Sequence, residues 1–364
     1  MTVAESNELP TDRRPWRTTP LVESVALSNA AGCRVFLKLE NLQPSGSFKS
    51  RGIGNLMTQA LLRAGAGSGS AANVHFYSSS GGNAGLAAVH ASAAGALGRP
   101  CTVVVPVSTP ARMVAKLRAA GARDVVRAGA TWAEADAHLR GVVMVEGGAG
   151  GVYVPPFDHV DVWEGNKGVV GEVVGQLRGM GMGMGGVEQE EGGGGGGGRP
   201  AAVVCSVGGG GLLNGVCMGV EEAGWAERGT KVVAVETEGA ASLNESVRAG
   251  RLVTLPGITS LAMSLGATRV SEVAFANGLK DYVKSVVYSD GEAAMGCLKL
   301  ADEERLLVEL ACGVSAAVCF GGRLEKAVGR KLRKEEAVVI VVCGGSHVTV
   351  EMLAEWRKKF EDVE

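Results

Sequence analysis

The sequence predicts an α/β protein with open, twisted and mostly parallel sheets that are flanked by helices. Apolar, strand-like segments alternate with helical segments over most of the chain, which is typical of a parallel sheet covered on both faces. The apolar runs at 101–106, 201–207 and 337–342 are too continuous for strands with one face in water. With 364 residues, the chain is long enough for about two domains of roughly 150 residues.

Composition and charge argue against several classes of protein. The net charge is −2 and no basic segment is present, so we expect no nucleic-acid partner. No apolar run approaches the ~20 residues of a membrane span, and residues 1–14 lack the apolar region of a secretory signal. The eight cysteines and five histidines are scattered, which argues against a disulfide framework and against a transition-metal site. We therefore expect a cytoplasmic protein with reduced thiols and no membrane partner.

The first 150 residues already show the alternation. Residues 1–30 read as a loosely ordered arm, and residues 65–72, rich in Gly, Ala and Ser, as a linker. The segment 35–40 predicts a strand, and apolar residues at helical spacing from 53 to 61 predict a helix. Further strands are expected at 74–77, 101–106 and 124–126, and helices at 84–96, 112–120 and 132–139.

A glycine-rich insert at 179–198 interrupts this pattern. It combines Gly-Met repeats, an acidic patch and a run of seven glycines. Such a segment cannot bury enough surface to offset its ordering entropy, so we expect a disordered surface loop; the alternative is a regulatory lid. After it, strands are expected at 201–207, 231–235 and 337–342, and helices at 212–223 and 350–359.

Lys49 stands at the point where the first strand has ended and a helix begins. Small residues (Ser45, Gly46 and Ser47) precede it. Alone, such a lysine would be interpreted as a solvated side chain. Two further loops, both rich in small residues and both between a strand and a helix, change this interpretation and suggest a cofactor site.

The first of these loops is the run of four glycines at 208–211. Glycines allow positive φ and close approach of a ligand, and a helix N-terminus attracts anions, so we expect a phosphate site. A dinucleotide-binding fold is the alternative, because Glu236 ends a strand about 25 residues later. However, the Gly-x-Gly-x-x-Gly register fails, since Leu212, Leu213 or Asn214 occupies a required position in each frame.

The other candidate segments are Ser78–Gly85 and Cys343–Ser346. The first presents several hydroxyls and free amides at a helix N-terminus, which suits a carboxylate. The second ends a buried strand, where ligands of open α/β sheets bind, and its thiol could share a hydrogen bond with a heterocyclic nitrogen. A buried core cysteine is the alternative. A lysine, a phosphate loop and a carboxylate loop together fit pyridoxal 5'-phosphate held through a Schiff base.

These motifs resemble those of the fold-type II pyridoxal-phosphate enzymes, whose fold is like that of the tryptophan synthase β subunit. Within them, the sequence is most similar to the serine-dehydratase branch of the L-serine/L-threonine dehydratases (ammonia-lyases). The resemblance runs from about Thr19 to the end of the chain without the insert. It is carried by 38–49, 79–85, 207–213 and 343–346, with 155–158, 163–165 and 235–237.

The resemblance implies α,β-elimination of L-serine, and of L-threonine, to pyruvate or 2-oxobutanoate and ammonia. It also implies a homodimer that acts on a small-molecule amino acid. We expect a large cofactor-binding domain formed by residues 1–47 and 151–364, and a small domain formed by residues 48–150 that closes over the substrate.

Roles for single residues follow from the same resemblance. Lys49 would form the Schiff base and abstract the α-proton, and Ser80 is a candidate proton donor. Phe48 would lie beside the cofactor ring, Asn83 would bind its 3-hydroxyl, and Cys343 would face the pyridine nitrogen. The phosphate would be bound by Gly208, Gly209, Gly210, Gly211 and Leu212, and the substrate by Ser79, Ser80, Gly81 and Asn83. A monovalent cation such as K+ would be held near Gly208, Glu236, Ala240, Leu265 and Ala267.

Several alternatives remain open at this point. A serine racemase, a cysteine-synthase-like β-replacement enzyme and a threonine synthase share the implied fold. Ser50-Arg51-Gly52 after the lysine argues against the last two, which carry Asp-Arg there. A nucleotide-binding oxidoreductase and an inactive cofactor-binding scaffold are more distant. Serine and threonine differ by one methyl group, worth only about 1–3 kcal/mol in a pocket, so their order of preference is open.

Overall fold

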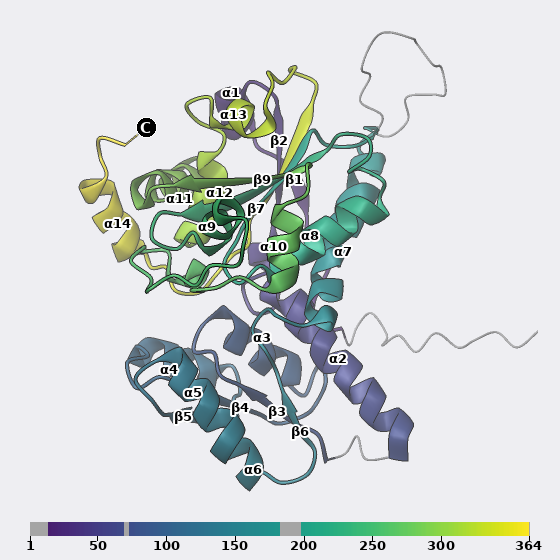
Figure 1. The fold of residues 1–364 in the computed structure, drawn as a ribbon, viewed down its shortest axis with the longest axis vertical. Coiled ribbons are helices and arrows are strands. Elements are labelled where there is room, and N and C mark those ends of the chain that lie inside the picture. Colours follow the sequence, from purple (N-terminus) through teal and green to yellow (C-terminus); the bar gives the residue numbers. More distant parts are fainter. Residues whose placement is uncertain (1–13, 69–72, 183–197, 364) are drawn as a thin grey trace, which may run out of the picture. The chain divides into compact units, whose positions relative to one another are not determined.

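The computed structural model describes residues 14–68, 73–182 and 198–363. These residues form two compact units. One comprises residues 14–17 with Gln43–Gly165, and the other comprises Thr18–Leu42 with residues 166–363 (Figure 1). The boundaries expected from the sequence were 48 and 150, so the smaller unit is longer at both ends than expected. The roles assigned to the two domains stay predictions.

The larger unit is built on a six-stranded sheet in the order β1-β2-β10-β7-β8-β9. All neighbouring strands are parallel except β1, which pairs antiparallel with β2. The strands β7 and β10 are buried along their whole length, as their continuous apolar sequences predict. The strands are β1 (Leu21–Glu23), β2 (Arg34–Lys38), β7 (Ala202–Ser206), β8 (Lys231–Thr237), β9 (Val283–Tyr288) and β10 (Ala337–Val341).

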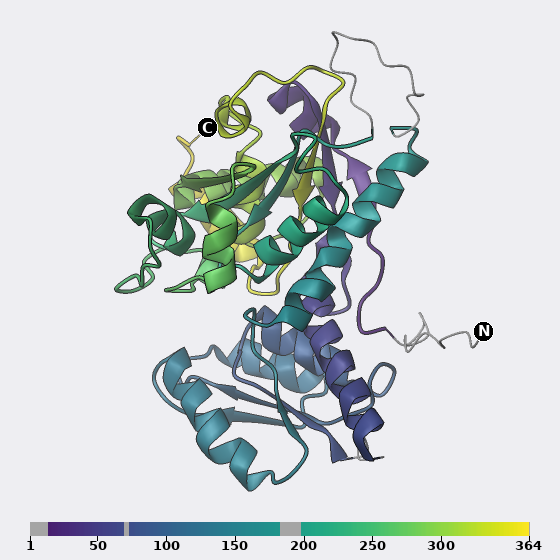
Figure 2. The same cartoon turned by 45° about the vertical axis from the view of Figure 1, so that its right-hand side comes forward.

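Helices lie on both sides of this sheet (Figure 2). Helix α8 packs against β7 and β8, and α12 packs against β7, β8 and β10. The helices that include residues of this unit are α1 (Val25–Ala31), α7 (Val160–Gly179), α8 (Gly211–Glu222), α9 (Ser242–Ala249), α10 (Glu272–Gly278), α11 (Asp290–Glu304), α12 (Leu310–Ala317), α13 (Arg323–Val328) and α14 (Val350–Lys359), with a 3-10 turn at Glu40–Leu42 and another at Met263–Leu265.

The smaller unit has a four-stranded parallel sheet in the order β5-β4-β3-β6. Its strands are β3 (His75–Ser78), β4 (Cys101–Val105), β5 (Asp124–Arg127) and β6 (Gly151–Tyr153). Its helices are α2 (Lys49–Ser68), α3 (Asn83–Ser92), α4 (Ala111–Ala119), α5 (Trp132–His138) and α6 (Met144–Glu146), and a π-helical turn at Leu139–Val143 joins the last two.

The predicted class, α/β with mostly parallel sheets and flanking helices, is confirmed. Two local predictions were wrong. The arm at 1–30 contains β1 and α1, because Ser24 caps α1 by accepting the Leu27 N–H and Gly32 ends it at φ +69°. The linker at 65–72 is helical as far as Ser68. Of the insert, Gly179 ends α7, and residues 183–197 lie outside the described residues.

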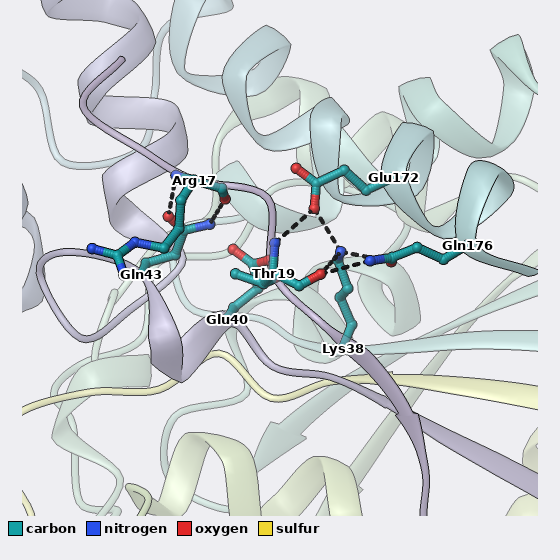
Figure 3. Close-up of polar contacts among 7 residues, drawn as sticks. All are labelled: Arg17, Thr19, Lys38, Glu40, Gln43, Glu172 and Gln176. Atoms are coloured by element: carbon teal, nitrogen blue, oxygen red, sulfur yellow. Dashed lines mark hydrogen bonds and ion pairs between the residues drawn. The ribbon is translucent and has the colours of Figure 1, made fainter. Parts of the chain in front are cut away.

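A buried polar network anchors β2 in the larger unit (Figure 3). The Lys38 side chain is fully buried, and its Nζ donates to Glu172 Oε2 at 2.6 Å and to Gln176 Oε1 at 2.9 Å, both on α7. It also donates to the Thr19 carbonyl at 2.7 Å. The Thr19 hydroxyl in turn donates to Glu40 at 2.6 Å. The strand, the segment before β1 and helix α7 are thus joined through one ammonium group.

In the smaller unit, Gln43 binds the backbone of Arg17. Its side-chain oxygen accepts the Arg17 N–H at 3.0 Å and its amide donates to the Arg17 carbonyl at 2.8 Å (Figure 3).

No helix in the described parts of the chain is both long and apolar enough to cross a membrane.

Candidate active site

Lys49 is the first residue of α2 in the smaller unit. Its Nζ donates to the Pro156 carbonyl at 2.7 Å and lies 5.1 Å from the centre of the Phe48 ring. The side chain is half-buried. The amine is therefore held on the loop that the sequence singled out, with the neighbouring aromatic ring beside it.

The loop before Lys49 is fixed by its own small residues. Gly46 has φ +78°, a conformation that favours glycine, and its N–H donates to the Gln43 carbonyl at 2.7 Å. The Ser45 and Ser50 hydroxyls are 2.8 Å apart. The Ser47 hydroxyl is buried and has no hydrogen-bond partner among the described residues. A buried hydroxyl without a partner is costly, so this one is a group that a bound molecule could satisfy.

The serine loop, residues 79–83, connects β3 with α3 in the same unit. The Ser80 Oγ accepts the Gly82 N–H at 3.3 Å, and Asn83 begins α3. A Cβ on Gly85 would lie 1.8 Å from the Ser80 carbonyl oxygen, so only glycine allows α3 to start this close to the loop. Gly81 is half-buried at the bend of the loop.

Ser79 makes a contact that sequence analysis did not anticipate. Its hydroxyl donates to Asp136 Oδ1 at 2.6 Å, and the Tyr153 hydroxyl donates to the same oxygen at 2.6 Å. A serine hydroxyl has one proton to donate. A substrate carboxylate could therefore be bound at Ser79 through the main-chain N–H, whereas the hydroxyl proton is committed to Asp136.

The glycine loop lies in the larger unit, between β7 and α8. Gly210 caps α8 with φ +93°, and a Cβ there would lie 2.2 Å from the Ala274 Cβ on α10. Gly209 is fixed through its carbonyl, which accepts the Ser271 N–H at 3.1 Å. The amides of Gly211 and Leu212 belong to the first turn of α8, where N–H groups have no intrahelical acceptor. The start of α8 thus has the backbone geometry of an anion-binding helix N-terminus.

A buried amide and hydroxyl network holds this loop on α10. Asn214 Nδ2 donates to the Ser271 Oγ at 3.2 Å, and Asn277 Nδ2 donates to Asn214 Oδ1 at 3.0 Å. Ser271 also caps α10 by accepting the Ala274 N–H at 3.1 Å. In the sequence, Asn214 stands where a dinucleotide-binding motif would need a glycine. In the structure, its side chain links α8 to Ser271 and Asn277 and so supports the glycine run 208–211.

Cys343 follows β10 in the larger unit and is buried. Its Sγ lies 3.1 Å from the Ser206 Oγ at the end of β7. The Cys312 Sγ accepts the N–H of Gly344, the residue after Cys343, at 3.1 Å. Hydrogen bonds from the Cys312 thiol and the Ser206 hydroxyl lower the pKa of Cys343 against the effect of burial, and burial raises the pKa of Cys312 well above its usual value.

The residues suggested for a cation are also in the larger unit. A Cβ on Gly208 would lie 3.2 Å from the Leu265 Cα, so these two backbones are close. The carbonyl of Leu265 accepts the Ala267 N–H at 2.8 Å, and the Ala240 N–H donates to the Thr237 carbonyl. Both oxygens of Glu236 accept backbone N–H groups at the start of α9, and burial raises the pKa of Glu236 to about 8. Whether a cation binds here stays a prediction.

The predicted residues therefore fall in two groups. Lys49, Phe48, Asn83 and the serine loop belong to the smaller unit, and the glycine loop, Cys343 and Glu236 belong to the larger unit. Sequence analysis missed Asp136 and Tyr153 beside Ser79, and Ser206 and Cys312 beside Cys343. These residues carry no local motif: Tyr153 and Ser206 lie on strands β6 and β7, whereas Asp136 and Cys312 lie on helices α5 and α12 that pack on the sheets.

Comparison with known proteins identifies the family. Residues 13–344 match the model of the pyridoxal-phosphate dependent enzymes. The chain is 41% identical over 343 residues to an L-serine dehydratase of Saccharomyces cerevisiae (strain AWRI1631), covering 92% of this chain and 95% of that protein. It is also 41% identical over 345 residues to the serine dehydratase-like protein of Rattus norvegicus, covering 93% of each.

A solved structure agrees with these sequence relatives. The fungal L-serine ammonia-lyase of Rhizomucor miehei superposes with a TM-score of 0.79 at 34% identity, covering 95% of this chain and 99% of that one. Maize serine racemase shares the fold, with a TM-score of 0.73 at 20% identity. This chain therefore belongs to the pyridoxal-phosphate-dependent enzymes and, within them, to the family of the L-serine dehydratases.

Proposed function

We propose that this chain catalyses the α,β-elimination of L-serine, and of L-threonine, to pyruvate or 2-oxobutanoate and ammonia. The observation that carries this proposal is Lys49, held at the start of α2 with its amine positioned by the Pro156 carbonyl, in a chain 41% identical to an L-serine dehydratase. The cofactor is pyridoxal 5'-phosphate, as in the family to which the chain belongs.

The described residues fit this cofactor. A lysine amine is the group that holds its aldehyde, and Lys49 supplies one. The N-terminus of α8 with its four glycines suits the phosphate, because the first N–H groups of a helix have no intrahelical acceptor and attract anions. Asn83 would bind the 3-hydroxyl, Phe48 would lie beside the ring, and Cys343 would face the pyridine nitrogen. The unpartnered Ser47 hydroxyl, two residues before Lys49, provides one further polar group.

The chemistry divides between the cofactor and the chain. Bound pyridoxal phosphate withdraws electrons from the Cα of an amino acid, which makes the Cα proton removable. The Lys49 amine accepts that proton, and the serine loop binds the carboxylate through its amides and through Ser80 and Asn83. The β-hydroxyl leaves as water with one proton, equivalent to the proton that Lys49 accepted, so that the Lys49 amine is neutral again when the step is complete. The enamine that is released then reacts with water to give the 2-oxo acid and ammonia.

A test uses the purified protein with L-serine, L-threonine and pyridoxal phosphate. We expect visible absorbance from the bound cofactor, with pyruvate as the main product from serine. Replacing Lys49 by Ala should reduce the rate at least about a hundredfold, the lower end of what a positioned base contributes. The matched control is Lys326→Ala, an exposed lysine on α13 of the larger unit, which should leave the rate unchanged. D-serine as the main product would indicate a racemase, and a protein without visible absorbance would overturn the proposal.

We further propose that the enzyme is a cytoplasmic homodimer without a nucleic-acid or membrane partner. The resemblance to the dehydratases supports the dimer, and the small net charge of −2 supports the absence of a nucleic-acid partner. Light scattering of the full chain should give twice the chain mass of 37.2 kDa. Fractionation of cells that express the tagged chain should place it in the cytosol.

A further inference from the structure

The carboxylate of Asp136 binds the first residue of the serine loop, and the mechanism above does not use it. Asp136, on α5, is largely buried, with 14% of its side chain exposed. Two hydroxyls donate to its Oδ1, one from Ser79 and one from Tyr153, both at 2.6 Å. Arg140, one turn along, lies 3.9 Å from Oδ2 and its guanidinium is 5.5 Å from the Tyr153 ring centre.

The sheet explains why these groups meet. In β3 side chains alternate between the two faces, so Ser79 follows Tyr77 on one face. Tyr77 packs with Ala135 and Leu139, which shows that this is the face covered by α5. Tyr77 is also in register with Tyr153 on the parallel strand β6. The end of β3, the end of β6 and the buried face of α5 therefore converge on Asp136.

The chemistry of this cluster fixes a direction for the Ser79 hydroxyl. An ionised carboxylate only accepts hydrogen bonds, and such charge-assisted bonds are about twice as strong as neutral ones. Ser79 is only 1% exposed, so water does not replace the acceptor. The Ser79 hydroxyl therefore donates its proton to Asp136. Because Ser79 is the first residue of the serine loop, this hydrogen bond attaches the start of the loop to α5.

We propose that Asp136 is a positioning residue that acts through Ser79 to hold the serine loop in the conformation that binds the substrate carboxylate. Tyr153 shares the same oxygen and keeps the carboxylate in place. This inference rests on the proposed function only for the identity of the substrate, because any α-amino acid would present its carboxylate to the same loop.

The proposal predicts an order of severity among variants. Asp136→Ala removes the acceptor of two buried hydroxyls and should weaken binding most. Asp136→Asn keeps one acceptor oxygen, and since both hydroxyls share a single oxygen, the amide should restore most of the binding. Tyr153→Phe leaves the Ser79 bond in place and should have a small effect. Ser79→Ala combined with Asp136→Ala should be no worse than the more severe single variant, because both disrupt one contact.

The experiment measures binding and turnover separately in the holoenzyme. L-alanine has the same carboxylate but no β-hydroxyl to eliminate, so its Kd can be read from the cofactor absorbance without turnover. For Asp136→Ala we expect the Kd of L-alanine and the KM for L-serine to rise about ten- to hundredfold, as for loss of a hydrogen bond to a charged group. The value of kcat should stay within about threefold, since uniform binding is lost. Asp124→Ala, an exposed aspartate on β5, is the matched control.

Each outcome decides the question. Unchanged Kd of L-alanine in both Ser79→Ala and Asp136→Ala would overturn the proposal, as would fully additive effects in the double variant. A fall in kcat with altered cofactor absorbance would mean a general structural role and would also overturn it. If Asp136→Ala does not fold, Asp136→Asn, Ser79→Ala and Tyr153→Phe still give the order. A wild-type protein that binds L-alanine but forms no pyruvate would refute the proposed function and leave this inference testable.

Discussion

At the residue scale, Glu236 gives the protein a defined response to pH. Its carboxyl is buried, and this burial raises its pKa to about 8, although the N–H groups of Leu243 and Asn244 oppose the shift. In the unfolded chain the pKa is near the usual value of 4.5. Between these values the folded protein holds a proton that the unfolded chain has lost, so stability falls as the pH rises from about 5 to 8.

Thermal unfolding at several pH values tests this expectation. In a buffer with tetramethylammonium as the only cation, the Tm should decrease between pH 5 and 8. Added K+ should flatten the decrease if the cation neutralises the carboxylate. Glu236→Gln should be less stable at every pH, because an amide cannot accept both N–H groups, but it should lose this pH dependence. A Tm that rises steadily over the same range would contradict the assignment.

Cys343 offers a second prediction at this scale. Cys343 follows β10, and its thiol lies 3.1 Å from the Ser206 hydroxyl at the end of β7. An aspartate here would hold a proton on a heterocyclic nitrogen, making the ring a stronger electron sink. We expect Cys343→Asp to raise the share of D-serine and transamination products relative to pyruvate, measured by chromatography. Cys33→Ala, another buried thiol of this unit, is the control. An unchanged product ratio would argue against a role for Cys343 at the ring nitrogen.

Single residues could be found from the sequence only where a motif is local. Lys49 and the run Gly208–Gly211 each stand between a strand and a helix, so their chemistry could be inferred from adjacent residues. Asp136 is separated from Ser79 by 57 residues. Its contact depends on the packing of α5 against the face of the sheet that carries Tyr77, and no spacing in the sequence predicts that packing.

At the scale of elements, the start of α8 depends on Gly210. An alanine at φ +93° would cost about 1–2 kcal/mol in backbone strain alone. Its Cβ would also lie 2.2 Å from that of Ala274, which adds about 1–3 kcal/mol of overpacking. We expect Gly210→Ala to lower stability and to weaken binding of pyridoxal phosphate, measured by equilibrium dialysis. Gly171→Ala, in α7 with open space around it, should be neutral or stabilising.

The attachment of β2 to α7 makes a further prediction. Lys38→Met would leave the Glu172 carboxylate, 17% exposed, without its ammonium partner. Breaking a buried ion pair in this way costs about 3–5 kcal/mol, which urea unfolding should detect. Adding Glu172→Leu should recover much of the loss. Arg34→Met on the same strand removes an exposed pair and should cost at most about 1 kcal/mol. Equal losses for the two single variants would refute the importance of the network.

Strands could be predicted from the sequence where both of their faces are buried. The strands at β4, β7 and β10 were found because both faces are covered and the sequence is apolar throughout. The edge strand β1 was missed because three residues carry no period, and β9 because most of its residues are only half-buried. Helix α1 was read as part of an arm, although Ser24 and Gly32 mark its two ends.

At the scale of the whole molecule, all eight cysteines are buried. The thiolate is the reactive form, and burial raises the pKa of every cysteine except Cys343, for example to about 11 for Cys33 and about 12 for Cys101. Hydrogen bonds lower the pKa of Cys343, so this thiol is protected by its burial alone. We expect no thiol of the native holoenzyme to react within minutes with an aromatic disulfide reagent at pH 8, and all eight to react in denaturant. A fast-reacting thiol in the native protein would show that one of these sites opens readily.

The class of fold and its two-part character could be predicted from the sequence, but the order of strands could not. Alternating elements indicate parallel sheets wherever they lie. That β10 lies between β2 and β7 depends on pairing between residues far apart in the chain, such as Ala337 with Arg34 and Val338 with Ala202. For the same reason, the assignment of residues 43–47 and 151–165 to the smaller unit had no local signal.

This strand order has a consequence for synthesis on the ribosome. Strand β2 emerges early, whereas its partner β10 is made 299 residues later, counted from Lys38 to Ala337. At about 5–20 residues per second, β2 waits roughly 15–60 s for that partner. The smaller unit is complete by Gly165 and can fold during this delay. During this time the apolar strand β2 lacks its partner β10 and can aggregate. We therefore expect a chaperone near the exit tunnel to bind the nascent chain until translation has nearly ended.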